Sequence, residues 1–185
     1  MKNPEQYLRN QMRPIPVRPL AAARRGTIVH AQIANFFEYP QHFNIDEITD
    51  SEEMKIDAGL MQNDAQVKQL YQRFEESRFA ALKPIAIEQS LELTIADKPV
   101  RCVVDAVFDT AKITGARPIT IVDWKTSRRP TDTDIESRRF QLALYRHAWA
   151  HSTGTPIECI DACFYYLGEK IRKNANCTSN RSALN

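Results

Sequence analysis

Hydrophobic positions in the first half of the chain recur with the period of an α-helix. Apolar residues three and four positions apart predict an amphipathic helix over about residues 20–39, which carries His30 and ends at Pro40. The same spacing predicts a second helix over 65–82. Between them, the acidic segment 44–58 is expected to form a loop with a short helix. The first half is therefore predicted to be helical.

Further along, the pattern changes to the alternation that is typical of half-buried strands. Apolar residues alternate over 85–95 and continue over 100–109, and Ala96-Asp97-Lys98-Pro99 between them predicts a hairpin. Glycine and proline residues then separate a third strand, a helix and a last strand, predicted at residues 119–125, about 134–151 and 159–167.

This order predicts one α/β (α+β) domain over residues 20–170. The sequence of elements is α-β-β-β-α-β, with a helical insertion after the first helix, and it predicts a mixed central sheet flanked by helices. Residues 1–19 are basic and rich in proline and read as an arm or linker, whereas 171–185 form a polar tail that is expected to be disordered.

Composition fits a soluble globular domain. The 185 residues are 43% hydrophobic and 26% charged, which suffices for one domain with a substantial core. No stretch approaches the roughly 18 consecutive apolar residues of a membrane span, and the N-terminus lacks the apolar core of a signal peptide. We therefore expect a cytoplasmic protein without a membrane partner, whose four cysteines are reduced thiols.

Charge is segregated along the chain in a way that the net charge of +2 conceals. Residues 1–25 are basic and 38–76 are acidic. A second basic cluster follows the third strand and would suit phosphate contacts, although a solvated helix face is the plainer interpretation of any one member; it comprises Arg128, Arg129, Arg138, Arg139 and Arg146.

Asp123-Trp124-Lys125 ends the third predicted strand and places an acid and an amine on one face. Side chains alternate across a strand, so Asp123 and Lys125 share a side, about 7 Å apart along the backbone, and Trp124 points to the other. Such a pair suits metal-assisted hydrolysis, but alone it more often marks a solvated face.

Asp105 lies among apolar residues in the preceding strand, where an unpaired carboxylate would be costly. A salt bridge to an arginine such as Arg101 is one explanation. The other is that Asp105 and Asp123 converge as oxygen ligands of a divalent ion, with His30 as a nitrogen ligand. A lone helical histidine is more often structural.

These residues together resemble the ordered motifs of a nuclease superfamily. Gly26-Thr27-x-x-His30, Asp105 in a strand, Ile121-Val122-Asp123-Trp124-Lys125-Thr126 and Gln141-x-x-x-Tyr145 on a helix are similar to the RecB-like branch of the PD-(D/E)xK nucleases. The resemblance is greatest to the C-terminal nuclease domain of bacterial helicase-nucleases of the UvrD, AddAB and AdnAB type. It covers about residues 20–170 and implies a restriction-endonuclease-like core.

The resemblance also implies roles for individual residues. His30, Asp105, Asp123 and the main-chain carbonyl of Trp124 would bind Mg²⁺ or Mn²⁺, and Lys125 would be the catalytic lysine. Glu88 matches a further acidic position of the family, although an exposed polar residue in an alternating strand is an equal alternative.

Gln141 and Tyr145 are four residues apart and therefore share a helical face, with Arg138 on the same stripe. In the family, this Gln and Tyr support the catalytic cluster and position the DNA backbone, so that face would point toward the site. Without the other motifs, a core tyrosine and a surface glutamine would be the expected interpretation.

Some relatives hold an iron-sulfur cluster with one cysteine before the histidine motif and three close together near the C-terminus. The cysteines of this chain depart from that pattern, so no cluster is expected; they are Cys102, Cys159, Cys163 and Cys177. We expect Cys159 and Cys163 to pack as small apolar side chains in the last strand.

The sequence therefore predicts a Mg²⁺- or Mn²⁺-dependent deoxyribonuclease in which an activated water attacks the phosphodiester. The resemblance implies an exonuclease acting on single-stranded ends, as the nuclease module of a helicase-nuclease in double-strand-break processing and repair. No Walker A motif is present, so a helicase domain of the same polypeptide or a partner subunit would supply the motor. The alternatives are an inactive DNA-binding or partner-binding module, and a stand-alone repair or CRISPR-associated nuclease.

Overall fold

The computed structural model describes residues 21–38, 64–111, 118–130, 135–169 and 177–179. The predicted arm at 1–19, the acidic segment at 44–58 and most of the predicted tail lie outside the described residues. The domain boundaries at 20 and 170 accordingly stay predictions. Among the described helices, none combines the length and hydropathy needed to cross a membrane.

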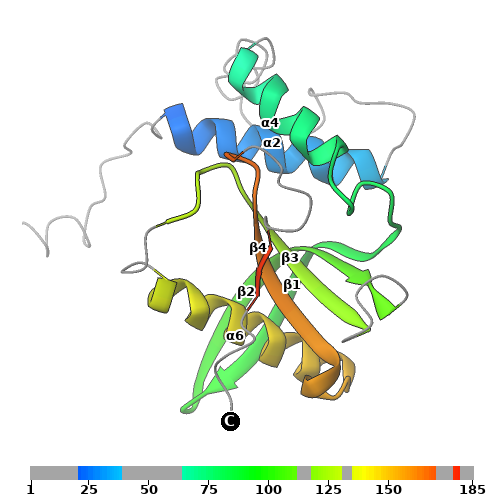
Figure 1. The fold of residues 1–185 in the computed structure, drawn as a ribbon. Coiled ribbons are helices and arrows are strands. Elements are labelled where there is room, and N and C mark those ends of the chain that lie inside the picture. Colours follow the sequence, from blue (N-terminus) through cyan, green and yellow to red (C-terminus); the bar gives the residue numbers. More distant parts are fainter. Residues whose placement is uncertain (1–20, 39–63, 112–117, 131–134, 170–176, 180–185) are drawn as a thin grey trace, which may run out of the picture.

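A mixed β-sheet forms the centre of the fold (Figure 1), in the order β1-β2-β3-β4-β5. Its antiparallel pairs are β1–β2, β2–β3 and β4–β5, whereas β3 and β4 run parallel on either side of the α6 crossover. The strands are β1 Pro84–Ile95, β2 Lys98–Asp109, β3 Ile119–Lys125, β4 Ile160–Tyr166 and β5 Cys177–Ser179.

Helices cover both faces of the sheet (Figure 1). Helices α2 (Ala21–Glu38) and α4 (Ala65–Glu75) bury their apolar sides against one face, where Trp124 is the largest buried side chain. Helix α6 (Ile135–Thr153) packs on the other face with Leu142 and Trp149. The predicted α+β class, with a mixed sheet flanked by helices and consistent with a restriction-endonuclease-like core, is confirmed.

The second helix is shorter than predicted. It ends at Glu75, and successive i→i+3 turns follow, with Ser77 donating to the carbonyl of Phe74 and Leu82 to that of Phe79. These tighter turns still place Phe79 in the core, because its ring is fully buried. The apolar stripe was thus identified correctly, but the extension of the helix to 82 was wrong, because i→i+3 turns replace the α-helical hydrogen bonds after Glu75.

The β1–β2 hairpin closes with a two-residue turn at Ala96 and Asp97, and β2 begins at Lys98, two residues earlier than predicted. Both turn residues have positive φ, at 47° and 60°. Two-residue turns with positive φ at both positions match the right-handed twist of the flanking strands.

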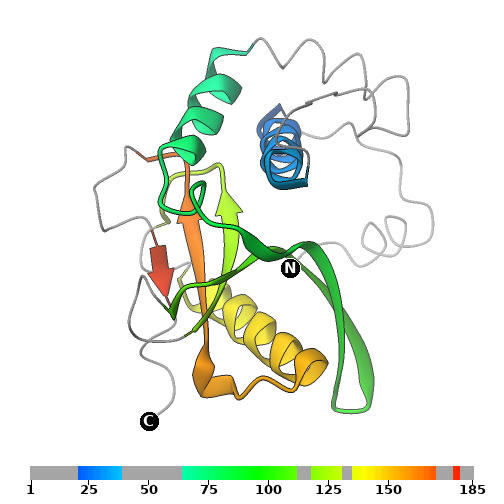
Figure 2. The same ribbon diagram turned by 90° about the vertical axis from the view of Figure 1, so that its right-hand side faces the viewer.

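The hairpin extends well beyond the other strands (Figure 2). Strand β2 pairs with β3 only over Ala106–Asp109, so the rest of β2 pairs with β1 alone. Leu91 and Val104, in this outer part, pack in the cluster of α6, whereas Ala106 packs in the cluster of α2 and α4. The even-numbered side chains of β2 therefore change from the α6 side to the side of α2 and α4 around Asp105.

The end of the chain differs from the prediction at two points. Strand β5 lies in the segment 171–185, which was expected to be disordered, and that expectation is wrong for Cys177–Ser179. Cys163 is buried as predicted, but it is disulfide-bonded, so the expectation of reduced thiols is wrong for this residue. Cys102 and Cys159 are free.

Residues that follow β3 and β4 are in close contact. Leu167 donates its N–H to the carbonyl of Lys125 at 2.8 Å, and a Cβ on Gly168 would overlap the main chain of Ser127 and Arg128. Only glycine allows this approach, which fixes the chain just after Lys125.

We expect Gly168→Ala to lower the free energy of unfolding by about 1–3 kcal/mol, because the main chain that the methyl group meets cannot rotate away. Urea denaturation measures the change. Ser127→Ala is the control and should change stability by less than about 0.5 kcal/mol, since only the main chain of Ser127 makes the contact. Equal stability of both variants would contradict the close approach.

Candidate metal centre and catalytic site

Asp123 and Lys125 end β3 on the sheet face that α6 covers, as the strand alternation predicts. The ammonium of Lys125 lies 2.6 Å from Oδ1 of Asp123 and 5.1 Å from the ring centroid of Phe164. Phe164 is the neighbour of Asp123 in β4, so its ring lies beneath the ion pair. Asp123 is only 3% exposed, which places this ion pair at the inner end of the site.

Helix α6 supplies two donors to the other oxygen of Asp123. Oδ2 accepts from Nε2 of Gln141 at 3.1 Å and from the hydroxyl of Tyr145 at 3.3 Å. Gln141 also donates to the Tyr145 hydroxyl. The two side chains share a helical face, as the spacing predicts, and together they orient the carboxylate.

Asp105 lies where the ladder between β2 and β3 stops. Its Oδ2 accepts the N–H of Trp124 at 2.7 Å, so a side chain replaces the missing main-chain partner. Nδ1 of His30, on α2, lies 3.4 Å from the same oxygen. The proposed salt bridge to Arg101 is not what Asp105 makes, since Nε of Arg101 donates to Ser90.

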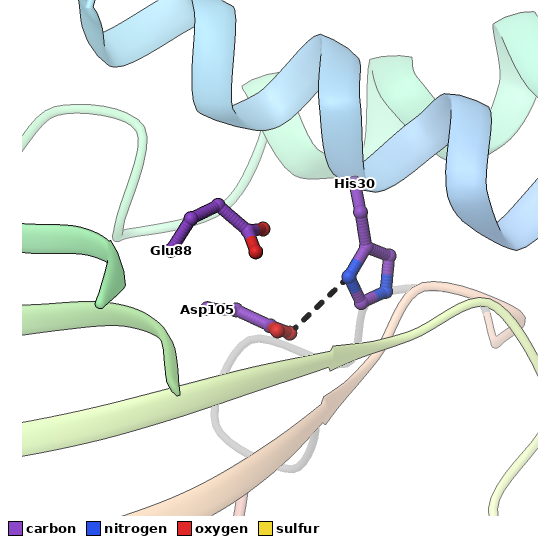
Figure 3. Close-up of side chains that lie close together, drawn as sticks. All are labelled: His30, Glu88 and Asp105. Atoms are coloured by element: carbon purple, nitrogen blue, oxygen red, sulfur yellow. Dashed lines mark ion pairs between the residues drawn. The ribbon is translucent and has the colours of Figure 1, made fainter. Parts of the chain in front are cut away.

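Glu88 completes a cluster with His30 and Asp105 (Figure 3). One ligand atom from each of the three lies within 4.8 Å of the others. Glu88 has φ of 45°, a left-handed conformation that is uncommon for a non-glycine residue and often marks a functional position. This break in β1 faces Asp105, because the regular pairs on either side are Ile87 with Ala106 and Gln89 with Val104.

Burial and like charge dominate the electrostatics of the inner carboxylate. Burial, and then the charge of Asp105, raise the pKa of Asp123 to about 6, although Lys125 and His30 oppose the shift. Burial and the Asp123 charge also raise the pKa of Tyr145, so its hydroxyl remains a neutral donor.

The outer groups respond to the same charges. Burial lowers the pKa of His30, but the hydrogen bond and the charge of Asp105 outweigh it and raise the pKa overall. Glu88 is exposed, yet reduced hydration and the charge of Asp105 raise its pKa. The carboxylates of the site therefore repel one another, a condition that a cation would relieve.

Two of the predicted DNA-binding arginines gather around Tyr166, the β4 neighbour of Lys125. The guanidinium of Arg129 lies 5.9 Å from the tyrosine ring centroid, and Nη1 of Arg138 lies 3.5 Å from its hydroxyl. Arg128 is exposed beside them. Arg146 is buried and donates to the carbonyls of Ile160 and Ile157, so its assignment to a phosphate-binding cluster was wrong.

The structure brings most of the predicted residues together, in two groups rather than one. His30, Glu88 and Asp105 form the outer group, and Asp123, Lys125, Gln141 and Tyr145 form the inner one. The groups meet at the β2–β3 junction, where Asp105 binds the main chain next to Asp123. A ligand role for the Trp124 carbonyl stays a prediction.

Sequence reasoning missed Phe164 and Tyr166, which line the site from β4. Alternation in β4 places the two on one face, but only the parallel pairing with β3 shows that this is the face of Lys125. Trp124, on the opposite face, packs edge-to-face against Phe74, Phe79 and Tyr165, as its predicted core position requires.

This donor set fits a divalent cation. Carboxylate oxygens with one imidazole nitrogen suit the harder divalent ions. Burial, and then the charge of Asp105, raise the pKa values of Asp123 and Glu88, and a bound cation would oppose both effects. A lysine next to such an ion can act on a phosphate or a water.

Comparison with known protein families gives a match over most of the chain. The family model described as the PD-(D/E)XK nuclease superfamily matches residues 4–183, a range that includes every site residue above. No curated protein matches the chain.

Stability should depend on pH through Asp123. Its pKa is about 6 when folded and near 3.8 when unfolded, so its favourable contribution is present below pH 3.8 and is lost as pH rises through 6. In EDTA, we expect Asp123→Asn to raise the free energy of unfolding by up to about 3 kcal/mol above pH 7, with little gain near pH 4.

Urea denaturation across this pH range measures the effect. Glu92→Gln, which removes an exposed carboxyl of β1, is the control and should show no comparable pH-dependent gain. A constant difference between Asp123→Asn and the wild type at all pH values would contradict the raised pKa.

Proposed function

The chain belongs to the PD-(D/E)XK nuclease superfamily, whose members are nuclease-type hydrolases, and we propose that it is a divalent-metal-dependent deoxyribonuclease. The observation that carries the proposal is the convergence of three possible ligands, His30, Glu88 and Asp105, beside the Asp123–Lys125 pair. An inactive binding module would not need a lysine held against a buried, destabilised carboxylate.

The residues that would hold the ion are Asp105, Asp123, His30 and Glu88. When bound, Mg²⁺ or Mn²⁺ would lower the pKa of water and neutralise charge on the scissile phosphate. Asp105 and Asp123 would supply the hard oxygen donors, and the imidazole of His30 would leave Mn²⁺ well tolerated. Glu88, as the exposed member, has access to solvent and substrate.

Besides the metal ion, the ammonium of Lys125 would place positive charge at the reaction site. Its side chain is 27% exposed, and its ammonium contacts Asp123. From there it can orient or deprotonate a water and stabilise charge that develops on the phosphorane. The Phe164 ring restricts its position from below.

Gln141 and Tyr145 act through Asp123, because both donate to its Oδ2. They fix the carboxylate in one orientation without adding charge. The N–H of Trp124 does the same for Asp105. These donors are positioning groups, and DNA contacts from Gln141 remain part of the proposal.

The proposed substrate is DNA, with single-stranded ends favoured. Arg128, Arg129 and Arg138 lie beside the end of β3 and would neutralise phosphates on either side of the cleaved bond. The resemblance to RecB-like modules supports exonuclease action on ends that a helicase domain or subunit delivers during double-strand-break repair. Such a role would place the protein in the cytoplasm.

We expect the purified protein to degrade an end-labelled linear single strand in Mg²⁺ or Mn²⁺ and to be inactive in EDTA. Lys125→Ala should reduce the rate by at least about 100-fold, because charge stabilisation in the transition state is lost. Asp123→Ala should abolish cleavage, since it removes a ligand.

Lys98→Ala, at the exposed tip of the hairpin, is the matched control and should retain full activity. A circular single strand of the same sequence should resist cleavage if the enzyme is an exonuclease. Full activity of Asp123→Ala would exclude the proposed mechanism.

The proposed phosphate contacts of the arginines can be tested by the salt dependence of DNA binding. Arg128→Ala should weaken binding of single-stranded oligonucleotides irrespective of sequence and reduce the slope of log affinity against log salt by about 0.7. Fluorescence anisotropy across a salt series measures both. An unchanged slope would show that Arg128 makes no phosphate contact.

A further inference from the structure

Arg129 is exposed, yet it is held at three points. Its main-chain N–H donates to Oε1 of Glu169 at 2.8 Å. Its guanidinium lies 5.9 Å from the ring centroid of Tyr166, within the range of a cation–π contact. Pro130 follows it, and a proline restricts the residue before it to extended backbone. Both the main chain and the guanidinium of this arginine are therefore restrained.

Glu169 can restrain its neighbour because the segment 167–169, which follows β4, is itself anchored. Leu167 donates its N–H to the carbonyl of Lys125 at 2.8 Å, and its own carbonyl accepts from Nη1 of Arg73, on α4, at 2.7 Å. The glycine between Leu167 and Glu169 approaches the main chain that follows Lys125 so closely that a Cβ would overlap it. The sheet and α4 thus hold the segment from two sides.

The carboxylate of Glu169 extends the contact between the two strands beyond their regular pairing. That pairing ends at Lys125 and Tyr166, and Glu169 binds the main chain of Arg129 further along. A hydrogen bond to a carboxylate is roughly twice as strong as one between neutral groups. A negative charge beside the proposed DNA path, by contrast, opposes phosphate binding. The useful property of Glu169 is therefore its acceptor oxygen and not its charge.

On the basis of the proposed nuclease function, we propose that Glu169 is a positioning residue that holds Arg129, and the adjoining Arg128, in place to contact the phosphates of the DNA strand. Tyr166 is the β4 neighbour of Lys125, so the guanidinium that it contacts lies beside the strand end that carries the lysine. An arginine that is already ordered loses less conformational entropy when it binds a phosphate, so the restraint increases affinity.

The test compares Glu169→Gln with Glu169→Ala in a Lys125→Ala background, which allows binding to be measured in Mg²⁺ without cleavage. Both variants lose the negative charge, but only the glutamine keeps an oxygen that can accept the N–H of Arg129. We expect the alanine variant to bind a labelled single-stranded oligonucleotide about fivefold more weakly than the glutamine variant. Its slope of log affinity against log salt should be smaller by about 0.7, the contribution of one phosphate contact.

Glu158→Ala, an exposed position just before β4, is the control for loss of a carboxylate and should keep the wild-type slope. In a background that also carries Arg128→Ala and Arg129→Ala, the two Glu169 variants should bind equally, because no guanidinium is left to position. Fluorescence anisotropy across a salt series measures all of these variants.

Equal affinity and slope of the two Glu169 variants when both arginines are present would overturn this inference but not the nuclease proposal. A difference that persists without the arginines would also overturn it, because Glu169 would then act through the fold. A wild-type protein that neither binds nor cleaves DNA would overturn the proposed function and this inference together.

Discussion

The carboxylate of Asp105 accepts the N–H of Trp124 at the point where β2 separates from β3, and the arrangement of the site depends on this contact. A strand that leaves its partner exposes unpaired main-chain groups, which are costly unless another acceptor replaces the ladder. Here the acceptor is also a candidate metal ligand. The hydrogen bond therefore lets the hairpin turn toward α6 and, at the same time, places Asp105 beside Asp123.

Because Asp105 lies beside Asp123, the two negative charges repel each other. Asp105 helps to raise the pKa of Asp123, and Lys125 offsets only part of the shift. The core behind the site is rigid enough to hold the charges together, because Trp124 is fixed among the rings of Phe74, Phe79 and Tyr165. A divalent ion at this place would gain the free energy that the repulsion costs the apo protein, so the strain itself favours cation binding.

Much of this could be predicted from periodicity. Alternation in β3 placed Asp123 and Lys125 opposite Trp124, and the i,i+4 spacing placed Gln141 with Tyr145, because both rules are local. The left-handed backbone of Glu88 could not be predicted, since alternating residues give no sign of a break in β1. Nor could the division of ligands into two groups, because it depends on where the β2–β3 ladder stops. Strand β5 was missed because this short segment lies in a polar stretch and becomes a strand only through pairing with β4.

Gln141 and Tyr145 orient the carboxylate of Asp123 as neutral donors, whereas Lys125 contributes a charge. Gln141 does not titrate, and the raised pKa of Tyr145 keeps its hydroxyl protonated well above neutral pH. The direction of the carboxylate is thus held by groups that stay neutral from acidic to well above neutral pH. Its charge, by contrast, depends on Asp105, Lys125 and any bound cation. Protonation of Asp123 would therefore abolish ligand charge without disordering the site, so loss of function at low pH need not involve unfolding.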